Sequence, residues 1–340
     1  MKLLHKALAS AAITTTVALS VSGAPAMAYT LTNGSGDASV TVGVDGYGSF
    51  GSSVAGSNTS NAIYNPVGPI PSAGTTFQSG VAIRIGSTGG RTFLTSGGIG
   101  GFGSLPNSTV TGTATTGNSS FSFGGLTFNL TQTLDALFSG STQTGSVLTQ
   151  SYTIANTTSN SLNFDLTRYL DGDLFFDSSS IDGGGRLVAN GTQLLFETDS
   201  ATGSSASTTF IGITAQGGTS NGYEIDEFSG IRCRFICGLR GEIISGTALD
   251  NIITGDGADA DQFIDAGNGY DVTLAFNNLF SVGAGQTTTY TTQTFFGSGA
   301  SDRMTPPAES VPEPASVLGL MAVSALGATS KLKRKQGQKA

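Results

Sequence analysis

The chain of 340 residues contains 50 glycines and no tryptophan; 38% of its residues are hydrophobic and only 11% are charged. Its 20 phenylalanines make it too apolar for a disordered chain, and many short strands joined by glycine-rich turns fit the composition better than a helical bundle. Residues 29–310 carry 8 arginines and 22 acidic residues, a net charge of −14, which would repel nucleic acid and anionic lipid and attract cations.

The N-terminus has the parts of a secretory signal peptide in their usual order. Lys2 and Lys6 provide a positive start, an apolar stretch runs from residue 7 to residue 21, and the small residues Ala26 and Ala28 mark a cleavage site. We therefore predict an N-terminal signal helix, export through the Sec translocon and removal of the leader by signal peptidase after Ala28.

The body that follows has a hydrophobic period of two, which is typical of strands. Apolar positions alternate within residues 40–44, 81–85, 126–130, 152–154, 162–166, 211–213, 272–276 and 290–294. Turn dipeptides lie between them, at Asn33-Gly34, Asp45-Gly46, Asp171-Gly172, Asp182-Gly183, Asn190-Gly191 and Asn221-Gly222. This pattern predicts an all-β fold, a large antiparallel β-sandwich, with a helix expected only within residues 225–244.

The residue types missing from the body exclude several kinds of chemistry. The single histidine, His5, lies in the signal peptide, and all six lysines lie at the two ends of the chain. Histidine-based nucleophile systems, histidine-ligated metals, Schiff bases and the phosphate-binding lysine of a P-loop are therefore excluded. Only carboxylate chemistry survives, and we expect a non-enzymatic body.

A first group of acidic residues lies in the middle of the chain, at Asp171, Asp173 and Asp177. On a strand, Asp171 and Asp173 would project from the same face. The alternatives are a plain turn between strands, a calcium site, or the carboxylate pair of a glycoside hydrolase.

A second acidic group contains Asp256, Asp259, Asp261, Asp265 and Asp271. Within it, residues 255–259 and 267–271 share a G-x-G-x-D pattern that resembles the calcium-binding repeat of RTX proteins. The two copies are twelve residues apart instead of nine, and two turns cannot stack into a β-roll. The alternatives are a single calcium site and an ordinary solvated loop.

Cys233 and Cys237 are the only two cysteines. On a strand their Cα atoms would be about 13 Å apart, too far for a bond, whereas a turn or a distorted helix would bring them within reach. Because the chain is expected to be exported, we expect a small local disulfide, with two free buried thiols as the alternative.

The C-terminus combines a short motif, an apolar run and a basic cluster. Val311, Pro312, Glu313 and Pro314 precede an uncharged stretch, residues 315–330, which the basic residues Lys331, Lys333, Arg334 and Lys335 then end. Sixteen helical residues span about 24 Å, short of a roughly 30 Å hydrocarbon core but within reach of a thin bilayer. We predict a short transmembrane helix with its basic end in the cytoplasm.

This arrangement resembles the PEP-CTERM sorting signal of bacterial exported proteins. The resemblance covers residues 311–340 and implies that the chain is held in the membrane at first and is then processed by an exosortase near the Pro-Glu-Pro motif. It also implies an association with exopolysaccharide and biofilm matrix. An ordinary single-span anchor is the alternative.

Together these features predict a signal peptide at 1–28, a sandwich body at 29–299, a linker at 300–310 and a sorting tail at 311–340. The function expected from the sequence is that of a non-enzymatic surface or extracellular-matrix protein. A calcium-dependent carbohydrate-binding module and a carboxylate-only glycoside hydrolase are the alternatives.

Overall fold

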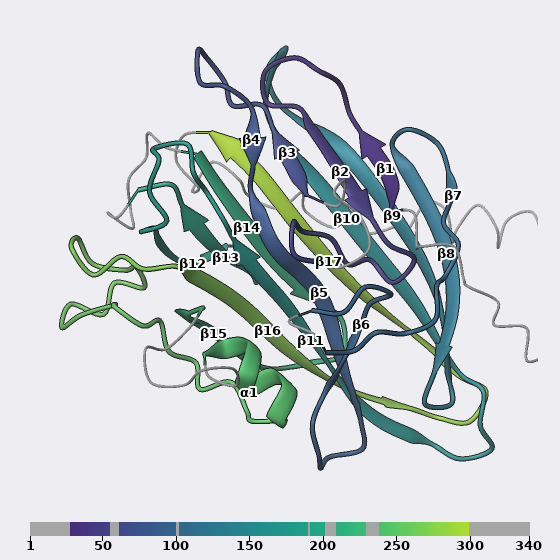
Figure 1. The fold of residues 1–340 in the computed structure, drawn as a ribbon. Coiled ribbons are helices and arrows are strands. Elements are labelled where there is room, and N and C mark those ends of the chain that lie inside the picture. The colour runs from purple at the N-terminus through teal and green to yellow at the C-terminus, as the bar shows by residue number, and fades with distance from the viewer. Residues whose placement is uncertain are drawn as a thin grey trace, which may run out of the picture.

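The computed structural model describes residues 28–54, 61–99, 102–189, 191–200, 209–228 and 238–298. In these ranges the strands form three antiparallel sheets, which confirms the predicted all-β sandwich (Figure 1). No helix in the same ranges has the length and hydropathy needed to cross a membrane. The expected anchor helix lies outside them, as does nearly all of the signal peptide.

The largest sheet has eight strands and forms one layer of the sandwich. Its strands follow the order β12 (Gly183–Ala189), β13 (Thr192–Thr198), β14 (Thr209–Gln216), β17 (Thr287–Ser298), β10 (Thr142–Asn156), β9 (Leu126–Ser139), β8 (Thr116–Phe123) and β7 (Thr111–Gly112). Along β9 the buried and exposed positions alternate, so the apolar side chains predicted from the period of two line its inner face.

The second layer is a five-stranded sheet. Its order is β15 (Thr219–Glu227), β16 (Val272–Val282), β11 (Leu162–Gly172), β5 (Thr76–Ile85) and β6 (Thr92–Leu94). The short helix α1 (Leu239–Ser245) packs on the outer face of this sheet, where Leu239 and Ile243 share a cluster with Tyr169 and Ala275 (Figure 1). Both faces of β11 are therefore buried over most of its length.

A small four-stranded sheet lies at the opposite end of the molecule from α1 (Figure 1). It consists of β1 (Tyr29–Thr32), β2 (Val40–Val44), β3 (Ala62–Tyr64) and β4 (Ala73–Gly74). The valines of β2 share a hydrophobic core with Leu134 and Leu148 of the eight-stranded sheet. This sheet therefore extends the second layer, and the first layer is covered by both smaller sheets.

A large charged side chain, Arg168, lies in the interior of the sandwich. Arg168 of β11 is fully buried and donates hydrogen bonds to Thr292 Oγ1 and Thr294 Oγ1 on the facing strand β17, at 3.0 and 2.9 Å. It also donates to Ser79 Oγ and to the carbonyl oxygens of Gly80 and Tyr169. These bonds join the two layers.

Each apolar stretch that was predicted to be a strand lies in a strand. Of the dipeptides that were predicted to be turns, some lie inside or at the ends of strands instead. Ala189 of β12 pairs with Thr192 of β13, on either side of the predicted turn Asn190-Gly191, and Asn190 itself lies outside the described residues. Three other dipeptides are not turns: Asp171-Gly172 ends β11, Asp182-Gly183 begins β12, and Asn221-Gly222 forms an irregularity inside β15. Helix α1 begins within the predicted range, residues 225–244, and ends at Ser245, one residue beyond that range.

Candidate functional site

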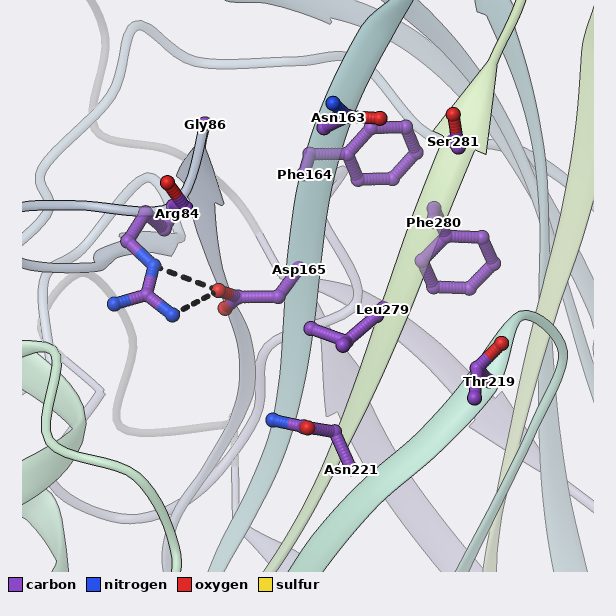
Figure 2. Close-up of a pocket in the computed structure, with 11 residues that line it drawn as sticks. Arg84, Gly86, Asn163, Phe164, Asp165, Thr219, Asn221, Leu279, Phe280 and Ser281 are labelled. Carbon is purple, nitrogen blue, oxygen red and sulfur yellow. Dashed lines mark hydrogen bonds and ion pairs between the residues drawn. The ribbon is translucent and has the colours of Figure 1, made fainter.

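A hollow of about 520 Å³ opens on the outer face of the five-stranded sheet, beyond the part that α1 covers (Figure 2). Its floor is one row of residues in register across four neighbouring strands, Thr219 of β15, Leu279 of β16, Asp165 of β11 and Arg84 of β5. Leu279 is 39% exposed and gives the hollow an apolar patch. Hydroxyl and amide side chains surround this row, namely Ser87, Asn163, Asn221 and Ser281.

Asp165 holds the floor of the hollow in place through two arginines. Its Oδ2 lies 2.7 Å from Nε and 2.5 Å from Nη2 of Arg84, and its Oδ1 lies 2.6 Å from Nε of Arg91. The guanidinium groups also donate to carbonyl oxygens that follow α1, Arg84 to Gly246 and Arg91 to Thr247. The two arginines therefore link Asp165 of β11 to the segment that follows the helix.

A chain of side-chain amides links the rim of the hollow to this ion cluster. Asn221 Nδ2 donates to Oδ1 of the buried Asn277 at 2.7 Å, and Asn277 Nδ2 contacts Asp165 Oδ1 at 3.3 Å. Because Asn277 is only 1% exposed, its amide is fixed and orients Asn221 in turn. The hollow thus presents preorganised donors and acceptors beside an apolar surface, the composition of many small-ligand sites.

A second place with unusual chemistry lies inside one end of the sandwich. Asp182, immediately before β12, and Glu197 of β13 project from the same face of the eight-stranded sheet into its interior. They are 2% and 0% exposed, and their carboxyl groups lie at hydrogen-bond distance from each other. Both oxygens of Glu197 and Oδ1 of Asp182 receive no hydrogen bond from an N–H or O–H group.

The electrostatics of this carboxyl pair follow from burial and mutual repulsion. Burial raises the pKa of Asp182 to about 8, and burial together with the adjacent Asp182 raises the pKa of Glu197 well above its ordinary range. Within the described residues the only ion pairs are those of Asp165, so neither member of the pair has a basic partner. Two such carboxylates need a proton or a cation between them.

The first acidic group predicted from the sequence lies around this pair. Asp171 is buried at the end of β11, and burial and the charge of Asp271 raise its pKa well above the ordinary value. Burial also raises the pKa of Asp173, which is half-buried, whereas Asp177 is exposed. The expectation of a plain turn at this place is wrong, because Asp171 pairs in the sheet with Gln78 and Thr273.

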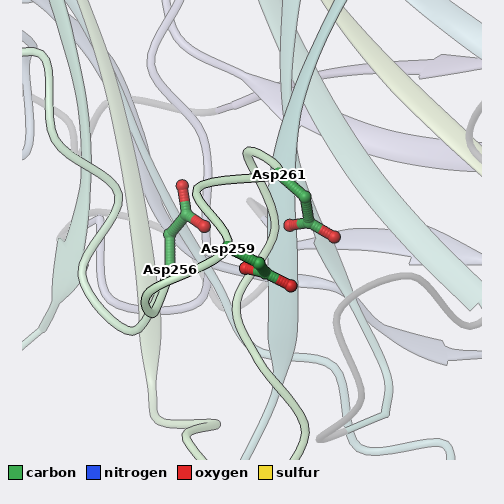
Figure 3. A group of neighbouring side chains, drawn as sticks. All are labelled: Asp256, Asp259 and Asp261. Atoms are coloured by element: carbon green, nitrogen blue, oxygen red, sulfur yellow. The ribbon is translucent and has the colours of Figure 1, made fainter.

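The second predicted group is divided by the fold. Asp256, Asp259 and Asp261 come together on one loop, with carboxylate oxygens within 4.8 Å of one another (Figure 3). Asp265 accepts a hydrogen bond from the Gly257 N–H of the same loop. Asp271 instead lies with the first group, where burial and the charge of Asp173 raise its pKa to about 6. The two G-x-G-x-D copies therefore do not form one site.

The remaining predicted site residues lie outside the described ranges. These are the sorting motif Val311, Pro312, Glu313 and Pro314, the basic cluster Lys331, Lys333, Arg334 and Lys335, the cysteines Cys233 and Cys237, and Ala26 of the cleavage site. Ala28 is the first described residue.

Glu197 was missed by the sequence analysis. It follows three apolar residues in β13, Leu194, Leu195 and Phe196, at a position that the period of two directs inward. A lone carboxylate at an inward position of an apolar strand was the available signal.

No protein-family model matches the chain, and a search of curated proteins gives no match. Among solved structures, a polysaccharide lyase resembles it with a TM-score of 0.34 and 9% identity, over 67% of this chain and 26% of the lyase. A galactose mutarotase related enzyme from Lactobacillus acidophilus resembles it with a TM-score of 0.37 and 7% identity, over 81% of this chain and 99% of that protein. The chain thus spans about a quarter of the lyase.

These comparisons correct one expectation. The body was expected to be non-enzymatic, and both proteins that resemble it are named as enzymes of carbohydrates. The expectation rested on missing histidine and lysine. The absence of these two residue types leaves carboxylate chemistry open, so it does not by itself exclude an enzyme.

Proposed function

We propose that this protein is exported, is held in the membrane by its C-terminal tail until an exosortase processes it, and acts at the cell surface or outside it on carbohydrate bound in the hollow. The leader that ends at Ala28 and the Val311–Pro314 tail support this location. Exopolysaccharide is the carbohydrate that the resemblance of the tail favours.

The observation that carries the proposal is the row Thr219–Leu279–Asp165–Arg84 with its surrounding amides. A sugar presents hydroxyl groups at its edges and C–H surface on its faces. Asn163 and Asn221 each offer a donor and an acceptor to hydroxyl groups, while the exposed part of Leu279 offers a surface to C–H groups. A volume of about 520 Å³ lies within the usual range for small-ligand sites.

The charge balance of the hollow favours a neutral sugar or a uronate over a cationic ligand. The carboxylate of Asp165 is fully engaged by Arg84 and Arg91, so the hollow offers no free anion to a cation. This contrasts with the strongly acidic character of the body as a whole.

The glycoside-hydrolase alternative does not fit the buried carboxyl pair. Glycosidases keep their two carboxyl groups about 5 to 10 Å apart around an accessible bond. Asp182 and Glu197 lie in hydrogen-bond contact and are closed to solvent. Any activity on a glycan in the hollow therefore has to use groups other than this pair.

The test combines binding and turnover. Purified full-length protein would be titrated calorimetrically with neutral and uronate-containing oligosaccharides, and the mixtures followed by NMR for new anomeric signals. We expect Asn221→Ala and Leu279→Ala to weaken binding at least tenfold, while Val188→Ala, an exposed site on the other sheet, leaves it unchanged. Equal binding by all three variants would refute the hollow as the site. Repetition in a chelator tests the calcium-dependent alternative.

A further inference from the structure

Glu197 is a fully buried carboxylate whose two oxygens have no hydrogen-bond donor. It faces Asp182, which is also buried and also has an oxygen without a donor. Burying a charged group without partners is costly, so a position of this kind calls for a ligand or a proton to compensate it.

Two other buried carboxylates, Asp45 and Asp165, have the partners that this pair lacks. Asp45 accepts hydrogen bonds from the backbone N–H groups of Tyr47, Ser49 and Ser96 and from two hydroxyl groups. Asp165 is neutralised by two arginines. The fold supplies partners for these two carboxylates, whereas Oδ1 of Asp256 on the surface loop resembles the pair in lacking one.

Glycine residues make the space in which the pair lies. A Cβ atom on Gly172 of the facing sheet would be 1.6 Å from Oε2 of Glu197, so the carboxylate occupies the place of a missing side chain. Gly184 lies directly across from Glu197 on β12 and leaves the adjoining position without a side chain. Strand β11 from one layer and strands β12 and β13 from the other therefore enclose the carboxyl groups.

Negative charge accumulates around this space. Asp171 and Asp271 both raise the pKa of Glu197, and Asp199 and Asp271 raise that of Asp182. Oxygen ligands with high negative charge density are what hard divalent cations such as Ca²⁺ prefer.

We propose that Asp182 and Glu197 hold a divalent cation of the calcium type inside this end of the sandwich, with Oδ1 of Asp182 and the two oxygens of Glu197 as ligands. The cation joins the edge of the eight-stranded sheet to the layer that contains Gly172. The site is distinct from the surface group Asp256, Asp259 and Asp261, whose carboxylates lie together on one loop. It does not depend on what the hollow binds.

The experiment compares cation binding by full-length protein after treatment with EDTA. Calcium would be added in thermal melts at about pH 7 and about pH 9, because protons and cations compete for carboxylate oxygens, and Tb³⁺ binding would be followed by tyrosine-sensitised luminescence at about pH 7. We expect calcium to raise the melting temperature of the wild type. Glu197→Gln and Asp182→Asn should each weaken binding at least tenfold and remove that rise.

Matched variants separate this site from the surface loop. The triple change Asp256→Asn, Asp259→Asn and Asp261→Asn should keep the calcium-dependent rise. In EDTA, we expect Glu197→Gln to be at least as stable as the wild type. This holds whether a proton or a cation lies between the carboxyl groups of the wild type. The response of the melting temperature to calcium is therefore what distinguishes the two. Should Glu197→Gln fail to fold, Glu197→Asp keeps the charge, shortens the reach and should also lose affinity.

Two outcomes would overturn the proposal. One is a wild type that shows no calcium-dependent rise at either pH, which would assign a shared proton to the pair. The other is a rise that survives Glu197→Gln and disappears in the triple variant, which would assign the cation to the surface loop.

Discussion

The carboxylate of Glu197 lies where a side chain at position 172 would begin. A Cβ atom on Gly172 would be 1.6 Å from Oε2 and 2.2 Å from Cδ of Glu197. Gly172 ends β11 in the five-stranded sheet and Glu197 belongs to β13 in the eight-stranded sheet, so this contact brings the two layers of the sandwich together at their acidic end. The sheets can approach this closely because residue 172 lacks a side chain.

We therefore expect Gly172→Ala to destabilise the protein. The added methyl group would displace the Glu197 carboxylate from Asp182, at a cost of roughly 1–3 kcal/mol, as for other overpacked interiors. Urea denaturation measures the change. Gly36→Ala is the control, because Gly36 is exposed and a Cβ atom there has no neighbour within 4 Å. Equal loss in both variants would mean that the contact with Glu197 has no energetic consequence.

Asp165→Asn should be among the most destabilising conservative changes in the chain. It leaves the guanidinium of Arg91, whose side chain is 0% exposed, without a counter-charge. Removing one partner of a buried ion pair costs about 3–5 kcal/mol. The same denaturation experiment checks this, with Asp135→Asn on the exposed side of β9 as the control, expected within about 0.5 kcal/mol of the wild type. A loss below about 1 kcal/mol would mean that Arg91 finds other partners.

The strands and the sandwich architecture were predicted from the sequence more accurately than the positions of the turns were. The alternating apolar residues at 40–44 and 81–85 lie in strands because a period of two places them on one face of a pleated strand. Asp171-Gly172 and Asp182-Gly183 have the composition of turns, yet they end and begin strands. Gly172 makes room for Glu197, and Gly183 pairs with Thr198 at the start of β12.

The candidate sites could be predicted only in part. Asp256, Asp259 and Asp261 are close in sequence, so their meeting on one loop follows from local spacing. The pair of Asp182 and Glu197 depends on the register of β12 with β13, and the floor of the hollow depends on the register of four strands. Because register is set by the packing of the whole sandwich, no local pattern in the sequence contains it.

Arg168→Met should destabilise the sandwich more than Arg168→Lys does. The guanidinium makes five hydrogen bonds, to Ser79, Gly80, Tyr169, Thr292 and Thr294, whereas an ammonium has three donors. Burial already lowers the pKa of Arg168 to about 10, and a lysine in the same place keeps the buried charge with fewer partners.

We expect a loss of at least about 2 kcal/mol for the lysine variant, from two or more unmet acceptors, measured by urea denaturation. Methionine has no donor, so all five acceptors would lose this partner and the loss should exceed that of the lysine variant. A lysine variant as stable as the wild type would show that the stability of the fold does not require all five hydrogen bonds.

The last prediction concerns pH and the outer face of the five-stranded sheet. Glu224 of β15 is 4% exposed, and burial, followed by the charges of Glu242 and Asp250, raises its pKa from 4.5 to about 8. The folded protein therefore binds this proton more tightly than the unfolded chain does. The resulting stabilisation is fully present below about pH 4.5 and is lost as the pH rises through about 8.

Glu224→Gln should remove that dependence, because the amide resembles the protonated carboxyl group and cannot ionise. Between about pH 5 and about pH 9 the free energy of unfolding of the wild type should fall further than that of the variant, by on the order of 2 kcal/mol. Urea denaturation at the two pH values gives this difference, and Asp135→Asn, at an exposed position, should follow the wild type. Since Asp182 and Glu197 also have raised pKa values, the wild-type curve alone proves nothing about Glu224. Parallel curves for the wild type and Glu224→Gln would instead place the pH dependence of this fold at the acidic end of the sandwich.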